Sequence, residues 1–180
     1  MTFTAAASKR IFDHRSTIHP YSPQADTWAL LAWGQAAPSA AGWPLANLAL
    51  FFPFEVLDTS IIYECFYATG TLTGGNLDIG LYDMTGARLT STGTTARGTA
   101  SSWITIGLTD YTISPGQYYA AMSADGTNNY VAWAPVAGAC ESMGMCEMTS
   151  AFVLPATATL ARTTRAYVPI FGFNLRSLGT

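Results

Sequence analysis

The stretch between residues 76 and 124 constrains the fold most, because it alternates strand-like segments with turn-forming ones. Residues 76–83 alternate apolar with small or polar residues, which is the period-two pattern of a half-buried strand. Gly86 interrupts the polar run that follows, as a hairpin loop does. A Ser-Pro-Gly turn at 114–116 then leads into residues 117–123, which are rich in aromatic side chains. This order predicts antiparallel strands and an all-β fold.

The same pattern continues through most of the chain after Trp43. Pro53 restricts the first of these further strands to a sheet edge or a bulge. Seven or eight short strands, with turn residues about every ten positions, predict an antiparallel β-sandwich, and a jelly roll is the closed form that suits such lengths. We assign residues 44–180 to this β-sandwich domain. The additional strands are expected at residues 48–54, 61–69, 88–92, 102–108, 130–133 and 167–175.

Residues 1–43 form an N-terminal arm in this prediction, because neither a strand nor a helix period persists there. The arm holds Trp28, Trp33 and Trp43, and three tryptophans argue against disorder. Two alternatives remain: a flap wrapped over its own sandwich, or an arm inserted into a neighbouring subunit. We expect the tryptophans to anchor the arm to a partner, since a buried aromatic side chain covers about 150 to 250 Å².

The surface is predicted to be poor in charge. Charged residues make up 11% of the chain, against about 25% in an ordinary soluble domain, and the net charge is −3. Either Thr, Ser and Asn keep such a surface soluble, or other subunits cover much of it. The second interpretation predicts a homo-oligomer, with a trimer favoured.

Several partners and locations are not expected. Only Lys9 and Arg10 are adjacent among the eight basic residues, so no basic stripe exists to bind nucleic acid. The apolar run at residues 45–54 is far shorter than the roughly 20 residues of a membrane-spanning helix. The first residues lack a basic region followed by an apolar core, which predicts no secretory signal and assembly in a cytoplasm.

The cysteines do not indicate a metal site. Cys65 lies within a predicted strand, where a free thiol behaves as a small buried apolar group. Cys140 and Cys146 are six positions apart without a neighbouring histidine, which differs from zinc-ligand spacing. They form either a disulfide across a tight loop or, as the missing export signal favours, two reduced thiols. The methionines of loop 138–148 either fill core gaps or make an intersubunit contact. We expect no metal and no other cofactor.

No catalytic constellation is evident, and we expect the protein not to be an enzyme. His14 and His19 both lie in the arm. Glycoside hydrolysis needs two carboxylates facing one cleft, whereas Asp78 and Asp83 are five positions apart and belong to opposite faces of one strand. Asp83 is expected to cap its turn.

The chain resembles a family of small structural proteins encoded in tailed-bacteriophage genomes. The resemblance covers residues 43–175 and implies membership of a virion without a defined activity. The segments that carry it are WPLANLALFFPF at 43–54, GNLDIGLYD at 75–83, GARL at 86–89, SPGQYYAA at 114–121, FVLPATA at 152–158 and VPIFG at 168–172.

We therefore expect a non-enzymatic virion surface protein, assembled in the host cytoplasm with other virion proteins as partners. In one role it is an oligomeric module of the tail or head fibre apparatus that contacts a host surface glycan. Sugars stack on aromatic rings and hydrogen-bond to Asn and Asp, which favours a contact loop of Asp125, Asn128, Asn129 and Tyr130, although these residues also suit an ordinary turn. In the alternative role it is a capsid decoration protein that clamps neighbouring capsid subunits through the N-terminal arm.

Overall fold

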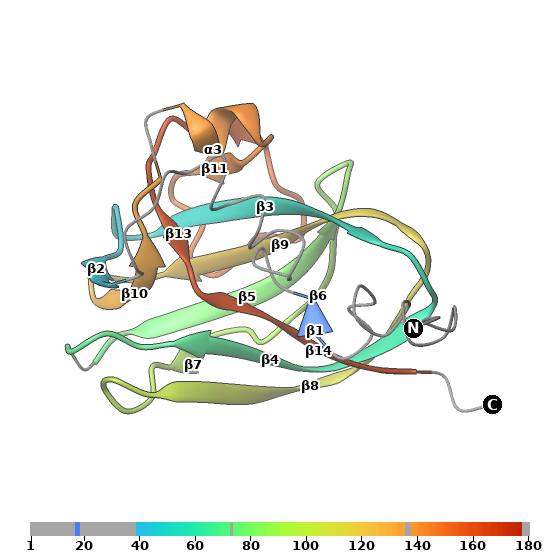
Figure 1. Cartoon of the computed structure of the whole chain (residues 1–180), viewed down its shortest axis with the longest axis horizontal. Helices are drawn as coiled ribbons and strands as arrows, with labels where there is room; N and C mark the ends of the chain where they lie inside the picture. Colours follow the sequence, from blue (N-terminus) through green and yellow to red (C-terminus); the bar gives the residue numbers. More distant parts are fainter. Residues whose placement is uncertain (1–16, 19–38, 73, 136–137, 178–180) are drawn as a thin grey trace, which may run out of the picture.

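The computed structural model describes residues 17–18, 39–72, 74–135 and 138–177. Within these ranges the chain is nearly all β-structure, and its antiparallel sheets pack as a sandwich, which confirms the predicted fold class (Figure 1). The finer assignment to a jelly roll stays a prediction.

A four-stranded sheet forms the lower layer in Figure 1. Every neighbouring pair in it is antiparallel. Among the described strands, β8 pairs only with β4, so the outer side of β8 is a sheet edge. The strand order is β1 (Thr17–Ile18), β14 (Phe171–Ser177), β4 (Ser60–Ala68) and β8 (Trp103–Ile113).

A seven-stranded sheet forms the upper layer, with β3 and β9 near its centre. The strand β11 pairs with β3 only at residues 49–51, so Pro53 lies where one side of β3 is open, in agreement with its predicted edge position. The order is β12 (Ala161–Arg162), β11 (Cys146–Met148), β3 (Leu48–Val56), β9 (Gly116–Ala124), β5 (Asn76–Asp83) and β6 (Arg88–Ser91), while β7 (Thr95–Ala96) also pairs with β5.

A small third sheet shows that the predicted domain boundary at residue 43 is wrong. Its order is β13 (Val168–Pro169), β10 (Asn129–Trp133) and β2 (Ser39–Gly42). Residues 39–42 therefore belong to the sandwich. Their small side chains, Ser-Ala-Ala-Gly, gave no strand pattern because the segment is held by pairing with β10 rather than by a buried apolar face.

Trp43 belongs to the core of its own domain. Its side chain is only 2% exposed, and its indole Nε1 donates a hydrogen bond to the Leu48 carbonyl oxygen at 3.1 Å. The rings of Tyr130 and Tyr167 meet it edge-on, with centroids 5.5 and 5.6 Å away. The prediction that Trp43 anchors an arm to a partner is therefore wrong. Trp28 and Trp33 lie outside the described residues, and their docking role stays a prediction.

The loop at 138–148 is docked onto the core. It begins with the short helix α3 (Ala139–Ser142) and brings Met145 to full burial in the main core, which supports the gap-filling interpretation. Cys65, Cys140 and Cys146 are buried free thiols, in agreement with the reduced alternative. Burial raises the pKa of Cys65 to about 12 and that of Cys140 to about 11.

Residues 149–160, which we call the strap, cover the outer face of the seven-stranded sheet. Ala151, Leu154 and Ala158 of the strap are buried in a second apolar cluster together with Phe51 and Tyr82 of the sheet. Backbone hydrogen bonds at 2.9 Å from Arg88 N to Ala156 O and at 2.8 Å from Ala158 N to Gly86 O hold the strap in place. Strand β5 is consequently buried on both faces.

Candidate functional site

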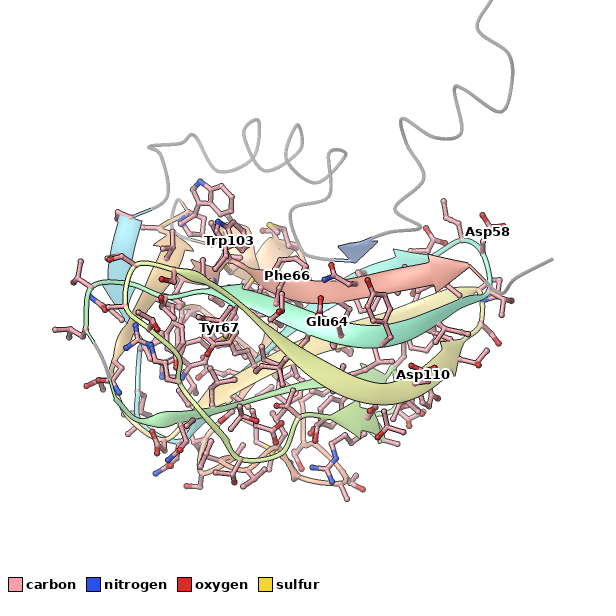
Figure 2. The ribbon with its side chains drawn as sticks, turned by 90° about the horizontal axis from the view of Figure 1, so that it is seen from below. Asp58, Glu64, Phe66, Tyr67, Trp103 and Asp110 are labelled. Atoms are coloured by element: carbon pink, nitrogen blue, oxygen red, sulfur yellow. The ribbon has the colours of Figure 1, made fainter. Side chains whose placement is uncertain are left out.

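The outer face of the four-stranded sheet carries an exposed aromatic side chain. Trp103, at the start of β8, is 65% exposed, whereas the strap covers the equivalent face of the other sheet. Its ring rests against Phe66 of β4, with centroids 5.7 Å apart and planes inclined at 50°. Figure 2 looks onto this face and shows Trp103 and Phe66 close together on it.

Sequence reasoning did not select Trp103, although the strand pattern contained the signal. Ile104, Ile106 and Leu108 of β8 pack against the core. Because side chains alternate along a strand, Trp103 and Gly107 must lie on the opposite, outer face. An exposed tryptophan on the outer side of an alternating strand makes Trp103 the candidate contact residue of this face.

Trp103 is the exposed member of this aromatic pair, since Phe66 is only 8% exposed, and the cross-strand neighbours of Phe66 are small. Across the strands, Phe66 lies opposite Gly172 of β14 and Thr105 of β8. Gly107 lies opposite Glu64, and a Cβ added to Gly107 would meet no atom within 4 Å. The surface beside the aromatic rings is therefore flat and open.

A polar pair lies next to the aromatic pair. Asn174 of β14 and Glu64 of β4 are cross-strand partners, and the Asn174 amide donates a hydrogen bond from Nδ2 to Glu64 Oε1 at 2.5 Å. Both side chains are half-buried, and the cross-strand pairing places them on the same face of the sheet as Phe66, two residues from Glu64. We refer to Glu64, Phe66, Trp103 and Asn174 together as the outer platform.

Three side chains of the predicted glycan loop make hydrogen bonds within the protein, and their contact with a glycan stays a prediction. Asp125 accepts hydrogen bonds from the backbone N and the side-chain Nδ2 of Asn76, at 2.9 and 2.7 Å. Asn128 Nδ2 donates to the Gly74 carbonyl oxygen at 2.6 Å, and Asn129 Oδ1 accepts from Leu72 N at 2.8 Å. These side chains tie the 125–129 turn to the neighbouring 70–76 loop, which is the ordinary turn role.

Tyr130 is not available to a ligand. Its side chain is 1% exposed and packs against Trp43 and Tyr67. The Arg97 guanidinium lies over its ring, 5.0 Å from the centroid. Burial raises the pKa of the Tyr130 hydroxyl, the largest influence on it. The prediction that Tyr130 stacks on a sugar is wrong, because the alternation of β10 turns this ring inward.

The carboxylates singled out in the sequence occupy different environments. Asp78 is fully buried beneath the strap, where its Oδ2 accepts a hydrogen bond from Leu154 N at 3.0 Å. Asp83 caps its turn as predicted, accepting from Thr85 N at 2.8 Å and Ala87 N at 3.0 Å. Hydrogen bonds, that from the Thr85 hydroxyl foremost, lower the pKa of Asp83, whereas burial raises that of Asp78.

Within the described ranges, no three His, Cys, Asp or Glu side chains lie close enough together to hold a metal ion. His14 and His19 are outside those ranges. Of the described residues, none forms a helix that is both long and apolar enough to cross a membrane.

Comparisons with protein-family models, with curated proteins and with solved structures found no match to this chain.

Proposed function

We propose that this protein is a non-enzymatic bacteriophage virion surface protein whose β-sandwich binds a host surface glycan on the outer platform. The observation that carries the proposal is Trp103, a large aromatic side chain 65% exposed on a flat sheet face and supported by Phe66. An exposed aromatic ring that rests on a second aromatic side chain offers a surface on which a ligand can stack.

The chemistry of the platform suits a sugar. The apolar face of a pyranose ring can stack on Trp103, as apolar ligand surface packs on aromatic side chains in binding sites. Sugar hydroxyl groups can donate to the oxygen atoms of Glu64 and Asn174, which lie on the same face. Because the platform is flat rather than concave, we expect weak binding per site that several copies on a particle would reinforce.

The virion location is supported by the sequence resemblance, and assembly with other virion proteins follows from it. The alternative role as a capsid decoration protein required an arm anchored by three tryptophans. Trp43 packs into its own core and is lost to such an arm, so the glycan-binding role is the better supported of the two.

A glycan array of bacterial surface polysaccharides tests the proposal. We expect the wild-type protein to bind at least one glycan and Trp103→Ala to weaken that binding about tenfold or more, the loss that follows from about 1.4 kcal/mol of stacking. Leu57→Ala is the matched control, because Leu57 is 62% exposed but lies in the connection between β3 and β4. Equal binding by Trp103→Ala and wild type, or no binding to any glycan or host cell, would overturn the proposal.

A further inference from the structure

The outer edge of β8 lacks the features that usually protect a sheet edge over its first part, residues 103–107. This part contains no charged residue and no proline, and it pairs regularly with β4, whereas Asp110 and the irregular pairing lie beyond it at 108–110. Natural sheet edges are commonly shielded by lysine, proline, bulges or a covering segment, because unpaired N–H and C=O groups recruit other strands. An uncharged and regular edge such as 103–107 is suited to pairing with a further strand.

Two further features of β8 indicate where such a strand would lie. Ile104 and Ile106 pack at the margin of the core and are only partly buried. On the outer face, Gly107 has open space around the position of a Cβ. A glycine in the middle of a strand marks a place where another backbone or a ligand approaches closely.

We propose that β8 pairs antiparallel with β8 of a second copy of this chain. The two-fold axis passes midway between the two copies of Thr105, which face each other. Residues equidistant from Thr105 then face each other on the same side of the joined sheet. Trp103 would lie beside Gly107 of the partner subunit, in the space that the missing side chain leaves. Ile104 would face Ile106 of the partner subunit along the core margin.

The register centred on Thr105 fits the side chains of β8 better than the registers centred on Ile106 or Gly107. With the axis at Gly107, Ile104 would face Asp110 of the partner subunit, setting an apolar side chain against a charge. With the axis at Ile106, Trp103 would face Thr109, where the β4–β8 pairing is irregular because its register shifts between Ile62 and Glu64. The axis at Thr105 keeps Asp110 outside the paired stretch, so the two-fold brings no like charges together.

Pairing through identical edges closes after two copies, because each edge is used up by its partner. The structure therefore favours a dimer over the trimer expected from composition. The contact consists of one strand pair and two tryptophans, which is small beside a standard interface of about 1,600 Å², so we expect dissociation in the micromolar range. Both Trp103 rings stay on one outer surface, and dimer formation does not require a glycan.

Introducing a charge at residue 105 tests the proposal. Sedimentation velocity over a concentration series should give a wild-type dimer, while Thr105→Lys and Thr105→Glu should each associate at least tenfold more weakly, because each charge faces its own copy. An equimolar mixture of these two variants should restore the dimer through opposite charges. Thr112→Lys, with the same charge on the same strand beyond the paired stretch, should dimerise like wild type.

Disulfide cross-linking tests the same contact by a second method. Residues that face each other in an antiparallel pair have Cα atoms about 4.5 to 5.5 Å apart, which a disulfide can bridge. Thr105→Cys should therefore form covalent dimers on mild oxidation, whereas Thr112→Cys should not. The three native thiols are buried and add little background. A wild-type mass of monomer or trimer, an undiminished dimer in Thr105→Lys, or no cross-link at residue 105 would overturn the proposal.

Discussion

Arg97 is the residue whose replacement should most clearly reveal how the loops at one end of the sandwich are held. Its side chain is 6% exposed, and its guanidinium donates to the carbonyl oxygens of Leu72, Gly70 and Asn129. The same group lies over the Tyr130 ring. Arg97 Nε is buried without a hydrogen-bond partner, so the arrangement is not free of cost.

The effect of Arg97→Met can be worked from these contacts. Gly70 O also accepts from Ser101 N at 2.8 Å and Asn129 O from Gly70 N at 3.0 Å, so among described donors only the Leu72 carbonyl is orphaned. That loss is about 1 to 3 kcal/mol, and the desolvated cation–π contact adds about 1 to 2 kcal/mol. The substitution also removes the unpartnered Nε, which offsets the loss of stability by about 1 kcal/mol. We expect a net loss of about 2 to 3 kcal/mol in the free energy of unfolding.

Urea unfolding followed by circular dichroism measures this loss, and the midpoint of thermal unfolding should fall by about 5 to 10 °C. Arg162→Met is the control: Arg162 is exposed and donates one long hydrogen bond, 3.4 Å, to Glu141 O, so its replacement should cost less than about 0.5 kcal/mol. An Arg97→Met protein within about 0.5 kcal/mol of wild type, or an equal loss in both variants, would refute the reasoning.

Three further predictions concern the strap and the buried ionisable groups. Burial raises the folded-state pKa of Asp78 above its ordinary value of 3.8, so its contribution to stability is complete below pH 3.8 and is lost as the pH rises through the folded pKa; Asp78→Asn should flatten this decline in urea unfolding measured over a pH series. Gly86→Ala should cost about 2 kcal/mol or more, because φ is +88° and the new Cβ would lie 2.5 Å from a strap carbonyl oxygen, whereas Gly93→Ala, with φ +64° and open space, should cost about 1 kcal/mol in the same assay. Cys65 and Cys140, with pKa values raised by burial to about 12 and 11, should react with an aromatic disulfide reagent only as fast as the protein unfolds, and rapid labelling of native protein would contradict this.

The regular strands could be predicted because their local patterns and their tertiary pairing agree. Residues 76–83 were predicted as a strand and form β5 with the same bounds, since the alternation and the following turn both act locally. β8 was predicted to end at 108 but continues to Ile113, past the irregular pairing at 108–110 that breaks its alternation. Trp103 alternates with Ile104, Ile106 and Leu108 of the core-facing side, so the strand pattern alone predicts that Trp103 lies on the outer face.

The remaining errors have a common physical origin, which is long-range contact without a local period. Ser39–Gly42 has small side chains and becomes a strand only through pairing with β10. Tyr130 follows two turn-forming asparagines, so it resembled a surface residue, but it enters the core with β10. The strap has neither helix nor strand periodicity, because backbone hydrogen bonds to Arg88 and Gly86 fix its course.

The strap also has a consequence for the order in which the chain can mature. Leu154 N bonds to the carboxylate of Asp78 across 76 positions, and Tyr82 donates its hydroxyl to Pro155 O across 73. Contacts so distant in sequence slow folding, because a long loop must close before any of them forms. During synthesis, β5 must wait with a carboxylate and the Tyr82 ring uncovered until residues beyond 150 leave the ribosome. We therefore expect chains truncated before the strap to be recognised by chaperones, so that completion of the C-terminal third determines when the domain becomes resistant to aggregation.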